Sequence, residues 1–306
     1  MPTTTLMLHD RTALAAPHPS AMNANANALF TDPNIAAAYA AYRPTYPPNV
    51  FALIKKYAIE HSVPLNDCVD IASGSGQAAV GLAQLFKSVI GLDASPAQVA
   101  AGNASQLHNV RFIVGSAEAT GLPSSSADAV VVAEALHWFD INAFYVEAAR
   151  VLRPGGVLAI IGYGASAITN NVAAQEAFHH LWHGVLGPYW HERRSIVDAL
   201  YVGVEPREPL FAHVERHDGL TMRREWSVDA IVGYARSWSG YTTYLASVGI
   251  TRGAPDDPAE MLRASLLEAT AVTSTQTRES TRDGILVMEW PLTVILGLVA
   301  PKTEDA

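Results

Sequence analysis

The chain has 306 residues, of which 49% are hydrophobic, so it is long enough for one large globular domain or a domain with a sizeable insertion. Its formal net charge of −9 disfavours nucleic acid and anionic membranes as partners, and no apolar stretch reaches the ~18 residues of a membrane-spanning helix. The single cysteine, Cys68, has no partner for a disulfide, so we expect a reducing compartment, the cytoplasm. The oligomeric state is left open between a monomer and a dimer.

The N-terminal segment, residues 1–28, is rich in Ala, Thr, Asn and Pro and is predicted to be a flexible tail. A transit peptide is the alternative, disfavoured because the segment has one Arg, no Lys and an Asp. Residues 29–64 are predicted to form N-terminal capping helices. The first begins with Asp32 as N-cap and Pro33 at the first helical position, carries Tyr39 on its apolar face and ends before Pro44.

Alternating strands and helices are predicted for residues 65–164, the expected cofactor-binding core. Short apolar runs rich in β-branched residues lie at 68–72, 88–92, 110–114, 128–133 and 157–162, and helical segments separate most of them. This alternation is typical of an α/β fold with a doubly wound, Rossmann-like, mostly parallel sheet.

The later part of the chain, residues 165–290, is rich in Trp, Tyr and His and is predicted to be a mostly helical, aromatic lid over the substrate with late core elements. Residues 291–306 are predicted to form the last strand and a tail. Within the lid region, His179 and His183 have the i, i+4 spacing of zinc ligands. They lie opposite the apolar stripe of their helix, however, so we expect a solvated face and no metal.

A turn with closely spaced glycines follows the first strand. Because a Cβ at Gly74 or Gly76 would occupy space near the backbone, the turn predicts close approach of a ligand, facing a helix that begins near Gln77. A dinucleotide site would favour a third glycine where the chain has Ala79. Asp93 ends the second strand and is placed to accept both hydroxyls of a ribose, which fits either kind of nucleotide cofactor.

The order of motifs along the chain distinguishes between these kinds of cofactor. Residues 70–76, Asp93, residues 115–123 and residues 152–156 resemble the successive motifs of class I S-adenosylmethionine-dependent methyltransferases. The flanking segments "YAAYRPTYP", "EALHWFD", "GPYWHERRSIVDALY" and "IVGYARSWSGY" are similar to small-molecule methyltransferases related to trans-aconitate methyltransferase. The resemblance implies S-adenosylmethionine as cofactor and covers most of the chain after residue 29.

The resemblance also implies roles for individual residues. Asp70 and the glycine turn would hold the methionine end of the cofactor, Asp93 its ribose, and Ser116 with Ala117 the adenine edge. The carbonyl of Ala133 would receive the methionine ammonium. The full set of expected cofactor-binding residues is Tyr39, Arg43, Asp70, Ala72, Gly74, Gly76, Gln77, Asp93, Ala94, Ser116, Ala117, Glu118, Ala133 and Leu136. Two positions depart from the family pattern, because Ala72 replaces a glycine and Ser116 replaces an acid.

The methyl acceptor is expected to bind among aromatic side chains. The predicted substrate residues are Trp138, Tyr189, Trp190, Arg193, Trp238 and Tyr241, with Tyr244 beside them, and Arg193 and Arg194 are candidates for holding an acid. A carboxylate acceptor is ionised at neutral pH and needs no base, whereas another O, N or S nucleophile needs one. His137 and Tyr39 are the catalytic candidates; a place for His137 in an aromatic cluster is the competing interpretation.

The predicted function is therefore methyl transfer to a small molecule, with a carboxylic acid as the favoured acceptor. Three alternatives remain: a protein that binds S-adenosylmethionine and catalyses a reaction other than methylation, an aminopropyl-transferring relative, and an NAD(P)-dependent oxidoreductase. Ala79 and residues 116–123 disfavour the oxidoreductase, and the absence of an acidic polyamine pocket from the sequence pattern disfavours aminopropyl transfer.

Overall fold

A computed structural model of the chain describes residues 42–276 and 284–300. The predicted tail, Tyr39 and nearly all of the first capping helix lie outside the described residues. The helices are α2 (Pro48–Glu60), α3 (Ala79–Leu85), α4 (Pro96–Ala104), α5 (Ile141–Val151), α6 (Val172–His179), α7 (Arg194–Asp198), α8 (Val228–Arg236), α9 (Ser239–Val248) and α10 (Pro258–Gln276). The strands are β1 (Asp67–Ile71), β2 (Ser88–Asp93), β3 (Val110–Val114), β4 (Ala127–Ala133), β5 (Leu152–Tyr163), β6 (Ala167–Ile168), β7 (Phe211–Ser227) and β8 (Ile285–Val299).

The strands form a single mixed sheet in the order β3-β2-β1-β4-β5-β8-β6. Strand β7 pairs with the edge of β8 that faces away from β5 and β6. The first five strands are parallel, and β8 runs antiparallel to β5, β6 and β7. The strand order reverses between β1 and β4, which is the feature that defines a doubly wound sheet. The predicted fold class is therefore confirmed.

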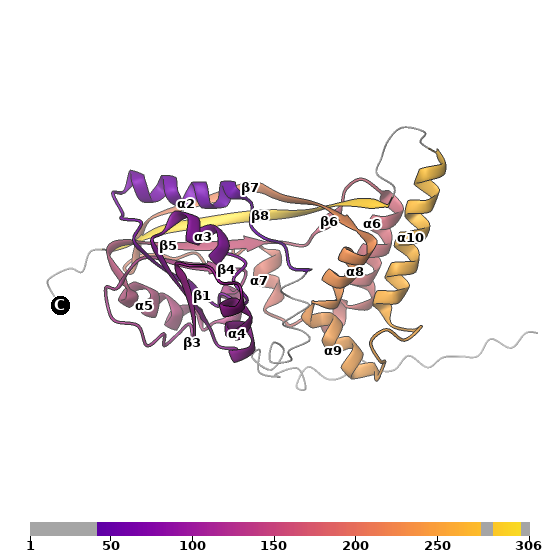
Figure 1. Ribbon diagram of the computed structural model, residues 1–306, viewed down its shortest axis with the longest axis horizontal. Helices are drawn as coiled ribbons and strands as arrows, with labels where there is room; N and C mark the ends of the chain where they lie inside the picture. Colours follow the sequence, from indigo (N-terminus) through magenta and orange to yellow (C-terminus); the bar gives the residue numbers. More distant parts are fainter. Residues whose placement is uncertain (1–41, 277–283, 301–306) are drawn as a thin grey trace, which may run out of the picture.

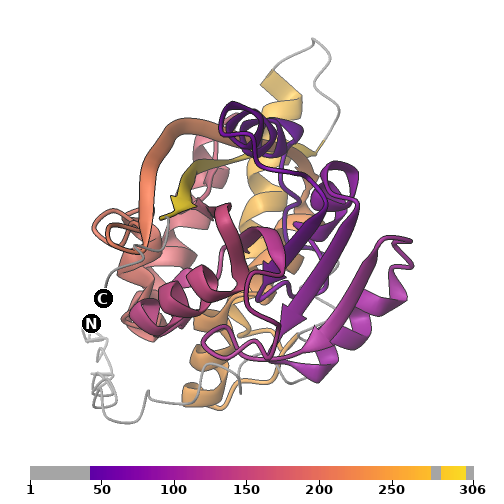
Figure 2. The same cartoon turned by 90° about the vertical axis from the view of Figure 1, so that its left-hand side faces the viewer.

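Helices cover both faces of the sheet because side chains of the central strands alternate between two apolar cores. In β4, Ala129 and Val131 pack with α2 and α3 on one face, while Val130 and Val132 pack with α5 and α7 on the other. Both faces of the central strands are buried, which explains their continuous apolar sequence. Figure 2, seen from the sheet end, shows helices flanking the twisted sheet.

A second group of helices lies beyond the sheet. Figure 1 shows β7 and β8 running as a long ribbon from the parallel strands to the helices α6, α8, α9 and α10 at the far end. Ser227 ends β7 and caps α8 directly by accepting a hydrogen bond from the N–H of Ala230. The ribbon thus carries the helices that face the carboxyl edge of the parallel strands.

The sequence interpretation of this region needs two corrections. Residues 211–227 form β7, a strand of 17 residues, where the pattern was interpreted as mostly helical. The last strand begins at Ile285 instead of residue 291. The charged and polar residues of β7 hide its alternation, because the strand is an edge with much of its length exposed. No helix in residues 42–276 or 284–300 is long and apolar enough to cross a bilayer.

Candidate functional site

The carboxyl ends of β1 and β4 meet where the strand order reverses, which is where open α/β sheets bind ligands. The chain leaves both strands through left-handed backbone conformations that side chains rarely adopt. The φ angle is +53° at Ala72 after β1 and +56° at Glu134 after β4. Backbone strain of this kind clusters at functional sites, so this edge is the candidate site.

A cavity at the ends of β1, β2 and β4, here called the strand-end cavity, is organised by Asp93. One carboxylate oxygen of Asp93 accepts the N–H of Gly74 at 2.8 Å, and the other accepts the N–H of Ser95 at 2.8 Å. Asp93 therefore ties the glycine turn to the loop after β2, and each oxygen keeps a lone pair for a ligand hydroxyl. Burial raises the pKa of Asp93, although these two hydrogen bonds oppose the shift.

A smaller cavity adjoins the strand-end cavity at Ala72, Gly74 and Ala133 and is lined by Asp70. Asp70 is fully buried, and neither of its carboxylate oxygens has a hydrogen-bond partner among the described residues. Burial, assisted by the charge of Asp93, raises the pKa of Asp70 to about 8. A buried carboxylate without a partner is costly, so the position suits a cationic group supplied by a ligand.

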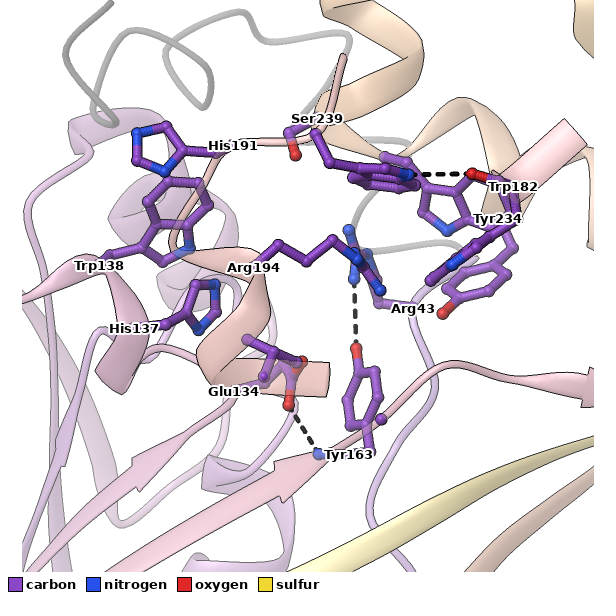
Figure 3. A pocket seen from close by; sticks show the side chains of 14 residues that line it. Arg43, Glu134, His137, Trp138, Tyr163, Trp182, His191, Arg194, Tyr234 and Ser239 are labelled. Carbon is purple, nitrogen blue, oxygen red and sulfur yellow. Dashed lines mark hydrogen bonds between the residues drawn. The ribbon is translucent and has the colours of Figure 1, made fainter. Parts of the chain in front are cut away.

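A third cavity lies between the strand ends and the far helices and contains two arginines, so we call it the arginine cavity (Figure 3). Its lining residues are Arg43, Glu134, His137, Trp138, Tyr163, Gly164, Trp182, Trp190, His191, Arg194, Val197, Tyr234, Trp238 and Ser239. The guanidinium of Arg194 lies 4.2 Å from the ring centroid of Trp182 and 4.1 Å from that of Trp190. These cation–π contacts fix the side chain so that it extends across the cavity toward Arg43.

The arginine cavity is lined by two guanidiniums and by the acid Glu134. Burial lowers the pKa of Arg194, Asp198, Tyr234 and Glu134 oppose this shift, and the charge of Arg43 adds a smaller lowering effect. Burial, with the charges of Arg194 and Arg43, lowers the pKa of His137 to about 3. His137 is therefore a neutral imidazole near pH 7, with Nδ1 3.1 Å from the hydroxyl of Tyr201. It is a much weaker base than the sequence suggested, because a pKa near 6.5 was expected.

Glu134 lines both the arginine cavity and the strand-end cavity. One of its carboxylate oxygens accepts the N–H of Tyr163 at 2.8 Å, so the side chain is anchored to the end of β5. Burial raises the pKa of Glu134 to about 7, against the lowering effects of this hydrogen bond and of Arg43 and Arg194. The group can therefore change its protonation state near neutral pH.

Most of the predicted site residues line one of the three cavities. The strand-end cavity contains Ala72, Gly74, Asp93, Ala94, Ser116, Ala117, Glu118 and Ala133. The smaller cavity contains Arg43, Asp70 and Gln77, and the arginine cavity contains His137, Trp138, Trp190 and Trp238. Residues distant in sequence are thus brought to one edge of the sheet.

Two predicted cofactor residues, Gly76 and Leu136, are absent from the lining of the three cavities. Gly76 has φ +100°, and a Cβ there would meet the ring of Phe112 at 2.8 Å, so packing and backbone shape require this glycine. Leu136 is fully buried in the core between the sheet and α5. The cofactor roles expected of both residues stay predictions.

Three predicted acceptor residues lie outside the lining of the arginine cavity. Arg193 donates to the carbonyl of Phe139 at 2.8 Å, and Tyr189 packs edge-on against Tyr244 with ring centroids 5.1 Å apart. Tyr241 is fully buried, and its hydroxyl donates to Asp257 at 2.9 Å. Each of these side chains is used in packing or in fixing the backbone.

The sequence interpretation missed several cavity residues, above all Glu134. This residue directly follows the predicted strand 128–133, a position at the carboxyl edge that could have identified it. Trp182 belongs to the apolar stripe that lies opposite His179 and His183 in the sequence pattern, and nothing local distinguishes it from a core residue. Tyr163 and Tyr234 lie at the ends of elements whose contact depends on the whole fold.

A doubly wound sheet with an acid at the end of β2 and adjoining cavities at the switch point is typical of nucleotide-binding proteins of the Rossmann-like class. Residues 69–160 match the family described as "Methyltransferase domain".

Relatives extend this match beyond residues 69–160. A Dictyostelium discoideum protein assigned as a methyltransferase is 36% identical over 213 residues, which are 69% of this chain and 78% of that protein. A trans-aconitate 2-methyltransferase of Deinococcus radiodurans is 38% identical over 100 residues, 32% of this chain and 38% of that protein. A structure from Anaeromyxobacter dehalogenans, assigned as a type II methyltransferase, has a TM-score of 0.66 at 30% identity and covers 85% of this chain and 100% of that one.

The chain belongs to the S-adenosylmethionine-dependent methyltransferase family. The predicted family and enzyme class are confirmed, and with them S-adenosylmethionine as the cofactor, in place of the nicotinamide alternative.

Proposed function

We propose that this methyltransferase transfers the methyl group of S-adenosylmethionine to the carboxylate of a small organic acid bound in the arginine cavity. The observation that carries the proposal is the pair Arg43 and Arg194, two guanidiniums that line one cavity with aromatic walls, where Asp198 already pairs with Arg194 at 3.2 Å. An anion bound between the two guanidiniums gains charge-assisted hydrogen bonds. The indole rings of Trp138, Trp182 and Trp190 suit an apolar or conjugated body on the acid.

The cofactor is proposed to occupy the two cavities at the strand ends. Asp93 would accept the ribose hydroxyls, and Ser116, Ala117 and Glu118 would surround the adenine. Asp70 would face the methionine ammonium, because its buried carboxylate lacks a hydrogen-bond partner among the described residues. This arrangement directs the reacting end toward Glu134 and the arginine cavity, since Glu134 and Trp138 line both spaces.

The chemistry demands little of the protein beyond alignment and exclusion of water. When bound, S-adenosylmethionine supplies a methyl group activated by a sulfonium, and in-line attack by a carboxylate oxygen yields a methyl ester and a neutral thioether. Arg43 and Arg194 would orient the carboxylate, and the tryptophans would keep water out. No group has to remove a proton, which agrees with the low pKa of His137.

Methyl transfer to a nucleophile other than a carboxylate is a second candidate function, because Glu134 could act as the base. An alcohol, thiol or amine acceptor would need a base, and a carboxylate with a pKa of about 7 at the junction of the cavities is better suited to that role than His137. The two guanidiniums favour the acid, however, and the Deinococcus relative is a methyltransferase of trans-aconitate. A non-methylating reaction would leave no methylated product and is distinguished by the same assay.

The proposal includes a cytoplasmic location and a small-molecule partner. The net charge of −9 opposes binding to nucleic acid, and the single cysteine agrees with a reducing compartment.

The test is a matched pair of acceptors. The protein is incubated with methyl-labelled S-adenosylmethionine and either phenylacetate or phenylacetamide, then with benzoate, trans-aconitate and a fractionated cell extract, and labelled products are identified by mass spectrometry. Methyl esters should form from acids and not from the amide of the same shape. Labelled ethers, thioethers or N-methyl products as the only products would refute carboxyl methylation.

Matched arginine variants locate the acceptor. Arg194→Gln should lower kcat/KM for the acid at least about tenfold, because it removes one charge-assisted contact. Arg223→Gln removes an exposed arginine of β7 that pairs with Glu225 and Glu289, and it serves as the control. Equal activity of the two variants would place the acid elsewhere.

A further inference from the structure

Glu134 occupies a position that methyl transfer to an acid does not require. Its carboxylate lies at the junction of the cofactor and acceptor cavities, in a strained backbone conformation with φ +56°. The hydrogen bond from the N–H of Tyr163 holds it there. An anionic side chain beside an anion-binding site would repel the acceptor, so its presence calls for an explanation.

The groups around Glu134 come from several elements and include two guanidiniums and a second acid. Arg43 approaches from the N-terminal segment and Arg194 from α7, and both favour the ionised form of Glu134. Asp198, also on α7, opposes ionisation and pairs with Arg194 at 3.2 Å. The remaining titratable residues lining the cavity are His137, Tyr163, His191 and Tyr234. Among the described residues that line the arginine cavity, Glu134 is the one acid.

We propose that Glu134 sets the selectivity for acceptor charge by taking up a proton when an acceptor carboxylate binds to Arg43 and Arg194. Without acceptor, the ionised side chain partly balances the two guanidiniums. The incoming carboxylate takes over that balance, and two carboxylates in one small cavity cannot both stay ionised at low cost. This inference rests on the proposed function, because it needs an anionic acceptor.

The proposal predicts how acceptor affinity depends on pH. Burial raises the pKa of Glu134 to about 7 in the protein without acceptor. Below that pH the side chain is already neutral and the acid binds without further cost. Above it each binding event must bring in a proton from solvent, so affinity falls as pH rises, by about tenfold between pH 6 and pH 8 if only the protonated form binds. A carboxylic acid with an ordinary pKa stays ionised throughout this range.

The experiment measures phenylacetate binding to the full chain saturated with S-adenosylhomocysteine. Trp138, Trp182, Trp190 and Trp238 line the cavity, so tryptophan fluorescence reports binding. The Kd of the wild type should rise about tenfold from pH 6 to pH 8, and that of Glu134→Gln should stay near the low wild-type value. Glutamine keeps an oxygen for the Tyr163 N–H, so the fold is preserved. Glu60→Gln, an exposed residue of α2, is the control and should keep the wild-type slope.

A second measurement needs only the wild type. In weakly buffered solution at pH 7.5, binding of phenylacetate should take up more than about half a proton, whereas phenylacetamide should take up none. Equal pH slopes in the wild type and Glu134→Gln, or no proton uptake with phenylacetate bound, would overturn the role of Glu134 and leave carboxyl methylation standing. Failure of both proteins to bind phenylacetate at pH 6, with S-adenosylhomocysteine bound, would overturn this inference and the acid acceptor together.

Discussion

Asp93→Ala should weaken cofactor binding while preserving the fold. The carboxylate of Asp93 is proposed to accept the ribose hydroxyls, and hydrogen bonds to a charged group contribute about 1.5–3 kcal/mol each. Its oxygens also accept the N–H groups of Gly74 and Ser95 at 2.8 Å, so the substitution loosens the turn that borders the cofactor. Asp93→Ala removes both ribose contacts, a loss of about 3 kcal/mol at the low end of that range, so we expect the Kd of S-adenosylhomocysteine to rise about a hundredfold or more.

Isothermal titration calorimetry measures this loss directly. Asp93→Asn keeps one acceptor oxygen and should fall between the wild type and Asp93→Ala. Asp256→Ala removes an exposed aspartate from the loop before α10 and should bind normally. Circular dichroism and the urea midpoint show whether each variant is folded. A well-folded Asp93→Ala with an unchanged Kd would refute the ribose assignment and the reasoning from the strand edge behind it.

Two further predictions concern Gly76 and His137. Gly76→Ala should destabilise the protein by about 1–3 kcal/mol in urea unfolding, because its φ of +100° and the contact with Phe112 both exclude a Cβ. Gly74 also has a left-handed backbone, with φ +55°, but it lines the strand-end cavity, so Gly74→Ala should cost less stability and should also lower cofactor affinity. A larger unfolding effect at Gly74 would reverse this assignment. In His137→Asn, as in the wild type, kcat for an acid acceptor should stay nearly constant between pH 6.5 and 9, with no rise at the pKa of a histidine. Because the folded pKa of about 3 lies below the unfolded value near 6.5, the wild type should gain stability as pH rises from about 3 to 6.5, and the variant should gain less. A wild-type activity limb near pH 6.5 that disappears in His137→Asn would restore the base role.

The parallel half of the fold could be predicted because its signals are local. The five parallel strands, and the position of the acid Asp93 at the end of the second one, each depend on a short stretch of residues and on the rule that parallel strands end at one edge. The edge strand β7 could not be recognised, because an exposed strand with charged residues lacks the apolar run that marks a buried one.

For the arginine cavity, the sequence predicts which kinds of side chain gather there, but not which individual residues line it. Trp238 and Tyr241 are separated by a single helical turn and have similar chemistry, yet Trp238 lines the arginine cavity and Tyr241 is bound to Asp257 in the core. The same holds for Arg193 and Arg194, which face different neighbours from the start of one short helix. Which member of each pair faces the ligand depends on the packing of the ribbon and the far helices, and a local pattern does not contain that information.

The charge changes of the proposed reaction also account for product release. Transfer from a sulfonium to a carboxylate converts two charged groups into a neutral ester and a neutral thioether, so Arg43 and Arg194 lose the anion that held the acceptor. The ester cannot replace the lost charge. Loss of the proton that Glu134 is proposed to carry in the acceptor complex then restores a negative charge beside the arginines, as in the protein without acceptor. The same residue would thus oppose acceptor binding at high pH and restore the charge balance of the cavity once the neutral ester has formed.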